Sequence, residues 1–136
     1  MRHSWLTIMV LLAGSMMARD IAAEEIPRAE HPRPQMRRDA WLNLNGSWEF
    51  RFDQEDRGRA ESWWTPTTDY DRRITVPFCW ESRLSGIADR GGQKIGWYRR
   101  SVVVPEAWKG SQVWLRFEAV DWEAFVWVNG KEVGRH

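Results

Sequence analysis

The sequence has little of the residue types on which common functional sites depend. It contains one cysteine and only three histidines, which stand far apart at positions 3, 31 and 136. One thiol cannot close an internal disulfide, and no pair of these residues has the spacing of a zinc site. Because Cys79 sits in an apolar stretch, we expect a buried, unreactive thiol. We therefore expect no metal and no cofactor.

Signatures of other common activities are also missing. No Gly-x-Ser-x-Gly sequence marks a nucleophile, and no glycine-rich loop runs into a helix as a phosphate-binding loop does. The 20 basic and 19 acidic residues nearly cancel and are dispersed along the chain. A nucleic-acid or anionic-membrane partner needs a clustered basic face, so we expect neither.

The first residues have the pattern of an export signal. Arg2 and His3 precede an apolar run over residues 5–17, which is shorter than the ~20 residues that span a bilayer. Small residues follow, and the best cleavage site lies after Ala23. The sequence therefore predicts a signal peptide over residues 1–23, outside the fold, and a periplasmic or secreted protein that keeps no membrane contact after cleavage. A flexible, proline-rich linker over residues 24–38 is expected next.

From residue 39 onward the chain alternates polar and apolar residues, as β-strands do. No segment has a helical period. The segments expected to form strands are residues 47–52, 74–76, 97–104, 112–119, 125–128 and 131–133. Asn129-Gly130 separates the last two and is typical of a tight hairpin turn. We expect surface excursions over residues 53–70 and 81–96.

This pattern predicts an all-β fold, an antiparallel β-sandwich of jelly-roll type over residues 39–136. A jelly roll needs about eight strands, and about six are expected here. We therefore expect the domain to be incomplete at its C-terminus.

Tryptophan is abundant, with 11 residues. Indoles bury a large area in a core and also stack on sugar rings. Core packing is expected for Trp41, Trp48 and Trp108. We expect Trp114 and Trp127 to cover the second face of the sheet or to meet a neighbouring domain. Trp80 and Trp97 flank the glycine-rich loop and are the better candidates for a ligand or an interface.

Two pairs of carboxylates lie two residues apart, at 69 and 71 and at 121 and 123. Glycosidases use paired carboxylates ~5–10 Å apart. Such spacing is common in any charged sequence, so we expect no catalytic residue in this chain.

Several stretches taken together resemble a known family. They are RDAW (residues 38–41), LNGSWEF (44–50), ITVPFCWES (74–82), GWYRR (96–100), VPEAWKG (104–110), AVDWEA (119–124) and VWVNGKEVGRH (126–136). In this order they are similar to the N-terminal sugar-binding domain of family 2 glycoside hydrolases, the β-galactosidase, β-glucuronidase and β-mannosidase group. The first two stretches run together as one motif, and the resulting six motifs in register are specific where each alone is weak.

The resemblance implies a jelly roll that packs on immunoglobulin-like and TIM-barrel domains of a parent enzyme, whose barrel carries two catalytic glutamates. It also implies that loops of this domain reach the active site and contact a β-linked carbohydrate. On that basis Glu81, Arg83, Asp89 and His136 are expected to contact the substrate, although ordinary solvated loop charges remain an alternative. Trp80 and Trp97, chosen for their place beside the glycine-rich loop, complete the expected substrate-contacting residues.

Three hypotheses follow. The chain is a non-catalytic fragment of an exported, retaining β-glycosidase, or a free-standing carbohydrate-binding module without hydrolase activity, or a non-functional remnant of a disrupted gene.

Overall fold

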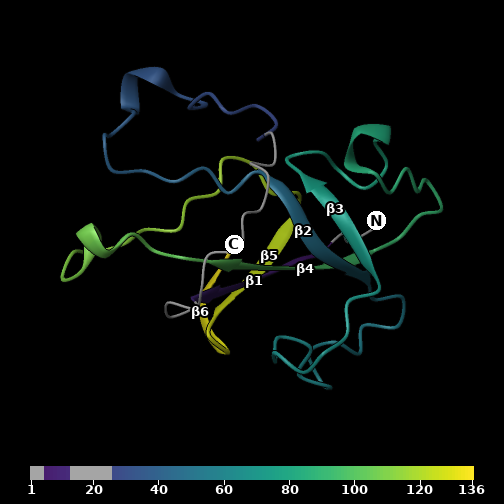
Figure 1. Cartoon of the computed structure of the whole chain (residues 1–136). Helices are drawn as coiled ribbons and strands as arrows, with labels where there is room; N and C mark the ends of the chain where they lie inside the picture. Colours follow the sequence, from purple (N-terminus) through teal and green to yellow (C-terminus); the bar gives the residue numbers. More distant parts are fainter. Residues whose placement is uncertain (1–4, 13–25) are drawn as a thin grey trace.

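The computed structural model describes residues 5–12 and 26–136, which form one six-stranded sheet in the order β3-β2-β4-β1-β5-β6 (Figure 1). The strands are β1 (Trp5–Leu12), β2 (Gly46–Phe52), β3 (Arg72–Val76), β4 (Ile95–Val102), β5 (Glu123–Val128) and β6 (Lys131–Arg135). Short 3-10 turns are η1 (Pro34–Met36), η2 (Arg83–Ser85) and η3 (Glu106–Trp108). The described residues contain no α-helix, and none of their helices has the length and apolar character to cross a membrane. The expected all-β fold class is confirmed.

Five of the six expected strand segments are found. β2 pairs antiparallel with β3 on one side and with β4 on the other. Along β2, Trp48 and Phe50 are buried while Glu49 between them is only half-buried, as the alternation predicts. β5 and β6 form the expected hairpin, and Asn129 and Gly130 both have positive φ, as its turn requires.

The strand β1 was not expected in the sheet. It lies between β4 and β5 and runs parallel to both, and β4 and β5 make no pairing with each other. Its sequence, WLTIMVLL, is a short apolar run, which suits both a central strand and the hydrophobic part of a signal peptide. Export stays a prediction, and the expected cleavage site after Ala23 lies outside the described residues.

The expected strand over residues 112–119 is wrong. These residues are irregular, and Val113, Trp114 and Phe117 are exposed. The sheet order gives the physical reason. Since β4 already lies between β2 and β1, and β5 between β1 and β6, neither strand offers a free edge for another strand.

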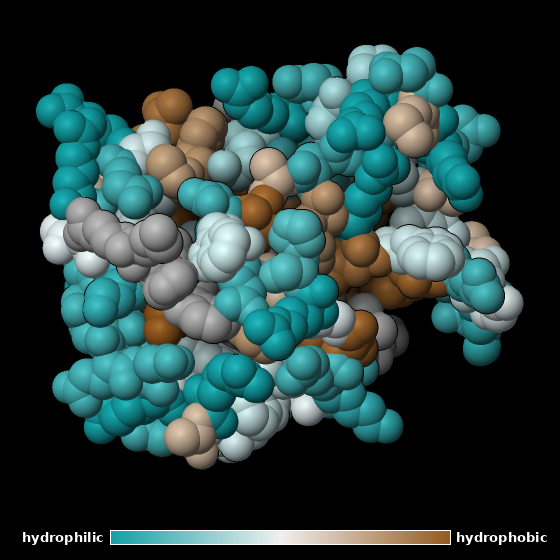
Figure 2. All heavy atoms as spheres, turned by 180° about the vertical axis from the view of Figure 1, so that it is seen from behind, coloured by the Kyte–Doolittle hydropathy of each residue, from teal (hydrophilic) through white to brown (hydrophobic). Residues whose placement is uncertain are grey.

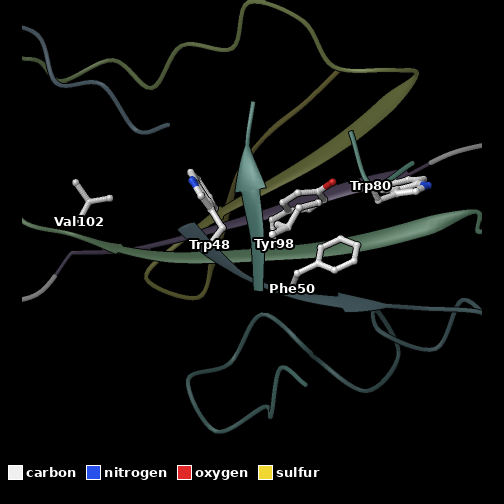
Figure 3. Close-up of a cluster of buried hydrophobic side chains, with 6 residues drawn as sticks. Trp48, Phe50, Trp80, Tyr98 and Val102 are labelled. Atoms are coloured by element: carbon white, nitrogen blue, oxygen red, sulfur yellow. The ribbon is translucent and has the colours of Figure 1, made fainter. Parts of the chain in front are cut away.

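The core is divided between the two faces of the sheet. On one face a first cluster consists of Trp48, Phe50, Ile74, Trp80, Tyr98 and Val102 (Figure 3). On the other a second group, which we call the tryptophan cluster, consists of Trp63, Tyr70, Ile95, Trp97, Phe125 and Trp127. Trp97 and Tyr98 are successive residues of β4, so their side chains point to opposite faces.

Two further expectations need correction. Residues 53–70 are not only a surface excursion, because they fold over the sheet and bury Trp63 and Tyr70 against it. The thiol of Cys79 is exposed, not buried, because the turn after β3 carries it outward while Trp80 turns into the core.

Residues 26–38 lie mostly exposed and are tied to the domain at a few points. The side-chain amides of Asn43 and Asn45 donate to backbone carbonyls of residues 27–29, and His31 packs edge-on against Trp41. Seen from behind, the molecule exposes hydrophobic side chains in a hollow bordered by hydrophilic ones (Figure 2). Apolar surface is therefore left uncovered on this face.

Candidate functional site

The tryptophan cluster is built around one buried carboxylate. Asp53 is 2% exposed and follows β2 directly. Its Oδ1 accepts from the backbone N–H of Arg57 at 2.9 Å, and its Oδ2 accepts from the N–H of Gly58 at 2.7 Å and from the indole Nε1 of Trp97 at 3.1 Å. A buried carboxylate needs such donors to offset its lost hydration. Asp53 thus holds in place both the start of the loop over residues 53–70 and the indole ring of Trp97.

Three indoles stack on this frame. The rings of Trp64 and Trp127 are parallel within 3° with centroids 5.1 Å apart, and Trp127 stacks on Trp97 at 5.5 Å. Trp127 and Trp97 are buried, and Trp64 is half-buried at the outside of the stack. The arrangement is a packed interior with one partly open ring.

The loop between β3 and β4 holds four of the six residues expected to contact a substrate. The N–H of Asp89 donates to the carbonyl of Trp80 at 2.9 Å, which closes the loop. Asp89 in turn accepts from the N–H of Gly91 and the amide of Gln93. Glu81 and Arg83 are exposed. These two charges are open to solvent and available for contact.

The two expected tryptophans are not open to a ligand. Trp80 is 8% exposed and packs against Phe50 and Phe52. A Cβ on Gly96 would lie 3.0 Å from the Trp80 ring and 2.9 Å from that of Phe50, so only glycine fits beneath them. Trp97 is 1% exposed and lies on the opposite face of the sheet. Both indoles therefore serve as core residues in this structure.

His136 lies at the end of the β5–β6 hairpin. Its backbone N–H and carbonyl pair with those of Ala124 at 2.9 Å, and its side chain is exposed. The structure thus brings Trp80, Glu81, Arg83 and Asp89 into one loop and leaves Trp97 and His136 on other elements. Substrate contact by these six residues stays a prediction.

A row of charged residues crosses three strands on the face that carries the tryptophan cluster. In the sheet register Glu49 of β2 lies opposite Arg73 of β3 and Arg99 of β4. Arg99 donates to Glu49 through Nε at 2.6 Å and Nη2 at 3.1 Å. Its Nη1 donates to three backbone carbonyls in residues 65–68, most closely that of Thr68 at 2.8 Å. Arg99 therefore joins the sheet to the loop that covers it.

The charged residues in this row shift one another's pKa values. The hydrogen bond from Arg99 lowers the pKa of Glu49, and its burial works in the opposite direction. The positive charges of Arg99 and Arg73 add to the lowering. Glu49 is therefore held in its ionised form.

A polar cavity of about 350 Å³ opens beside this row. Its lining consists of Ser47, Glu49, Arg73, Arg99, Arg100 and Ser101. Arg100 donates to the carbonyls of Leu44 and Asn45 at 2.8 Å each. Within residues 5–12 and 26–136, no three histidine, cysteine or acidic side chains come together where a metal ion would bind.

Sequence reasoning missed both of these assemblies. Asp53 and Trp63 were predicted to lie in a surface excursion. An aspartate directly after a strand and two adjacent tryptophans in a polar loop instead indicate a loop that packs against the sheet. The row of charges was foreseeable in part, since Glu49 and Arg51 alternate with buried residues. Its partners on β3 and β4 depend on register, which sequence alone does not provide.

Residues 41–136 match the model of the glycosyl hydrolases family 2 sugar binding domain. The chain belongs to this family. The family 2 match covers the five strands from β2 to β6 and every residue of the charged row and of the tryptophan cluster.

Family 2 relatives include a β-glucuronidase of Paenibacillus borealis, 32% identical over 94 residues, which are 69% of this chain and 16% of that enzyme. A β-glucuronidase of Bacteroides fragilis is 33% identical, over 68% of this chain and 12% of the enzyme. A β-galactosidase of Priestia megaterium is 28% identical, over 69% of this chain and 11% of the enzyme. The chain spans less than a fifth of the length of each of these relatives.

Proposed function

We propose that this chain is the N-terminal, non-catalytic sugar-binding part of an exported family 2 β-glycosidase, which hydrolyses O-glycosyl bonds with retention. The observation that carries this proposal is the family match over residues 41–136 together with relatives that are themselves β-glucuronidases and β-galactosidases several times longer than the chain. In this proposal the two catalytic glutamates lie in a barrel domain of the same polypeptide.

The domain then contributes surface and loops to an active site that it does not itself contain. The hydrophobic side chains gathered in the hollow of Figure 2 support this role, because a contiguous apolar surface usually marks a contact with another domain or protein. Val103, Trp114, Trp122 and Val133 are each more than half exposed. We assign these residues to contact with the immunoglobulin-like or barrel domain of the parent enzyme. Glu81 and Arg83 are assigned to the carbohydrate side.

The alternative is a free-standing carbohydrate-binding module without hydrolase activity. Trp114 is 81% exposed and Trp122 is 60% exposed, and open indoles of this kind stack on sugar rings. The two functions differ in the size of the native polypeptide.

An antibody against residues 41–136 tests them in the cell and culture fractions of the source organism. The enzyme proposal expects an exported band several times larger than this chain, with an N-terminus at Glu24 and activity on an aryl β-glucuronide or β-galactoside. An exported band no larger than the chain, inactive but retained on an immobilised β-glycan, supports the module instead. A band that stays in the cytoplasm contradicts export in both.

A further inference from the structure

The strands β4 and β5 are separated by one strand only. Both run parallel to β1 and pair with it, and they do not pair with each other. Among the described strands, β1 is therefore the one partner that β4 and β5 share (Figure 1). We call the place between β4 and β5 the central position. A segment that fits there needs about the length of β1, which has eight residues, and must pair on both sides.

The connection over residues 103–122 joins β4 to β5 and has to run back along the sheet. Ile95 and Glu123, the first residues of the two strands, are level with each other, since both lie opposite Trp5. β4 ends at Val102, at the other end of β1. The chain must return over roughly 25 Å, the length of eight extended residues. A segment that returns in this direction is antiparallel to both β4 and β5 and needs only short turns at its ends.

Part of this connection, residues 112–119, has the sequence of a strand. Val113, Leu115 and Phe117 alternate with a second set of residues that includes two charges, and the segment is as long as β1. In the structure it is irregular, and the side chains of Val113, Trp114 and Phe117 are 52%, 81% and 38% exposed. Burial of such side chains is favourable, so this segment gains from any position in the sheet that becomes open to it.

The spacing to β5 also fits. If residues 112–119 lie beside β5, residues 120–122 form the turn, and hairpin loops usually have about two to five residues. A turn of this length sets Phe117 opposite Phe125 and on the same face of the sheet. Phe125 belongs to the tryptophan cluster, so an exposed ring then joins a buried apolar group.

We propose that β1 and residues 112–119 compete for the central position, and that residues 112–119 take it once β1 is removed. The expected signal peptide contains all of β1, so cleavage after Ala23 exchanges one strand for the other. Every pairing of the sheet is then antiparallel, since those of β2 with β3 and β4 and of β5 with β6 already are. The maturation step rests on the export that is part of the proposed function, whereas the competition rests on register and sequence alone.

The test starts from the full chain with a protease site inserted after Ala23. Complete removal of the segment is required, because a single change in β1 leaves its other residues paired in the central position. The folded chain is cut, the peptide is removed in urea, the remainder is refolded, and amide hydrogen exchange is compared before and after. The amides of residues 113–118 are expected to exchange freely before the cut. After it they are expected to be as protected as those of β4 and β5.

A proline variant makes the test specific. Arg116 is exposed in an irregular segment, so Arg116→Pro is expected to leave exchange in the uncut chain unchanged. In the cut chain the proline removes a donor from the middle of a central strand, and protection of residues 113–118 is expected to be lost. Arg116→Gln is the matched control. It also loses the exposed ion pair with Glu118 but keeps the backbone N–H, and it is expected to behave like the parent.

Free exchange of residues 113–118 after the cut would overturn the proposal. Aggregation on cutting would do so too, because β4 and β5 then present two open edges. An equal effect of Arg116→Pro before and after the cut would assign Arg116 to the loop and not to a new strand. Cutting in vitro does not depend on export, so failure here leaves the proposed function untouched. A native polypeptide that is not exported removes the maturation step, and protection that appears on cutting still supports the competition.

Discussion

Trp97 and Asp53 stand 44 positions apart in the sequence, and in the interior of the domain the indole nitrogen of Trp97 donates to the carboxylate of Asp53 at 3.1 Å. The same carboxylate holds the first turn of the loop over residues 53–70. One side chain thus joins a core indole to the loop that buries it.

Replacement of Asp53 by alanine is expected to destabilise the domain by about 3 kcal/mol, because two buried donors, the N–H of Gly58 and the indole of Trp97, lose their acceptor, and each costs ~1–3 kcal/mol with partial relaxation. Asp53→Asn keeps one oxygen and is expected to cost about half as much. Urea denaturation followed by tryptophan fluorescence measures both. Glu55→Ala, at an exposed position of the same loop, is the control, and an equal loss in that variant would contradict the role of Asp53.

Gly58 is the second point at which the loop meets Trp97. A Cβ at Gly58 would lie 2.3 Å from the Trp97 ring, which is fully buried and cannot move away. Gly58→Ala is therefore expected to cost about 2 kcal/mol, as overpacking of a core does. Gly134→Ala on β6 is the matched control, because a Cβ there meets nothing within 4 Å. Thermal unfolding of the two variants tests this prediction. Equal melting temperatures would show that the loop shifts to make room for the added methyl group at no cost in stability.

Acid is expected to weaken the link between the sheet and its covering loop. The pKa of Glu49 in the folded state lies below its unfolded value, chiefly through the hydrogen bond from Arg99. The stabilisation is therefore complete above the unfolded pKa, near 4.5, and is lost as pH falls through the folded pKa. Water reaches this carboxylate, so we expect about 1 kcal/mol or less.

Urea midpoints measured between pH 3 and pH 7 test this linkage. Glu49→Gln is expected to lower stability at pH 7 and to flatten the decline toward pH 3. Glu106→Gln is the control, since that carboxylate sits in an exposed ion pair with Lys109. A decline as steep in Glu49→Gln as in the parent would assign the acid sensitivity to other groups.

Much of the sheet follows from local pattern, and its arrangement does not. Alternation at Trp48 and Phe50 and the Asn129-Gly130 turn are enough to predict β2 and the β5–β6 hairpin, because both are set by neighbouring residues. Residues 112–119 alternate just as clearly, yet they form no strand, since pairing depends on a free edge that β4 and β5 do not offer. The local sequence pattern indicates which conformation a segment favours. Whether the segment forms a strand depends on whether another strand has an unpaired edge to receive it.

The candidate site was predictable to a smaller extent. The charges Glu81 and Arg83 were expected to be exposed and are. Trp80 and Trp97 flank a glycine-rich loop in the sequence, which suggested that they are accessible to a ligand. Whether an indole is buried depends on which face of the sheet it points to and on what packs against that face. The partnership of Arg73, Glu49 and Arg99 spans three strands and follows only from their register.

The strand β1 carries the last prediction, because among the described strands the β5–β6 hairpin is hydrogen-bonded to the rest of the sheet only through β1. A central strand has a partner for its N–H groups on both sides, so proline at its middle removes a donor and interrupts the pairing. In the full chain, Ile8→Pro is therefore expected to expose the amides of β5 and β6 to hydrogen exchange while those of β2 and β3 stay protected. Ile8→Val keeps the donor and is the control. Unchanged protection of β5 in Ile8→Pro would show that the hairpin is held without the pairing of β1.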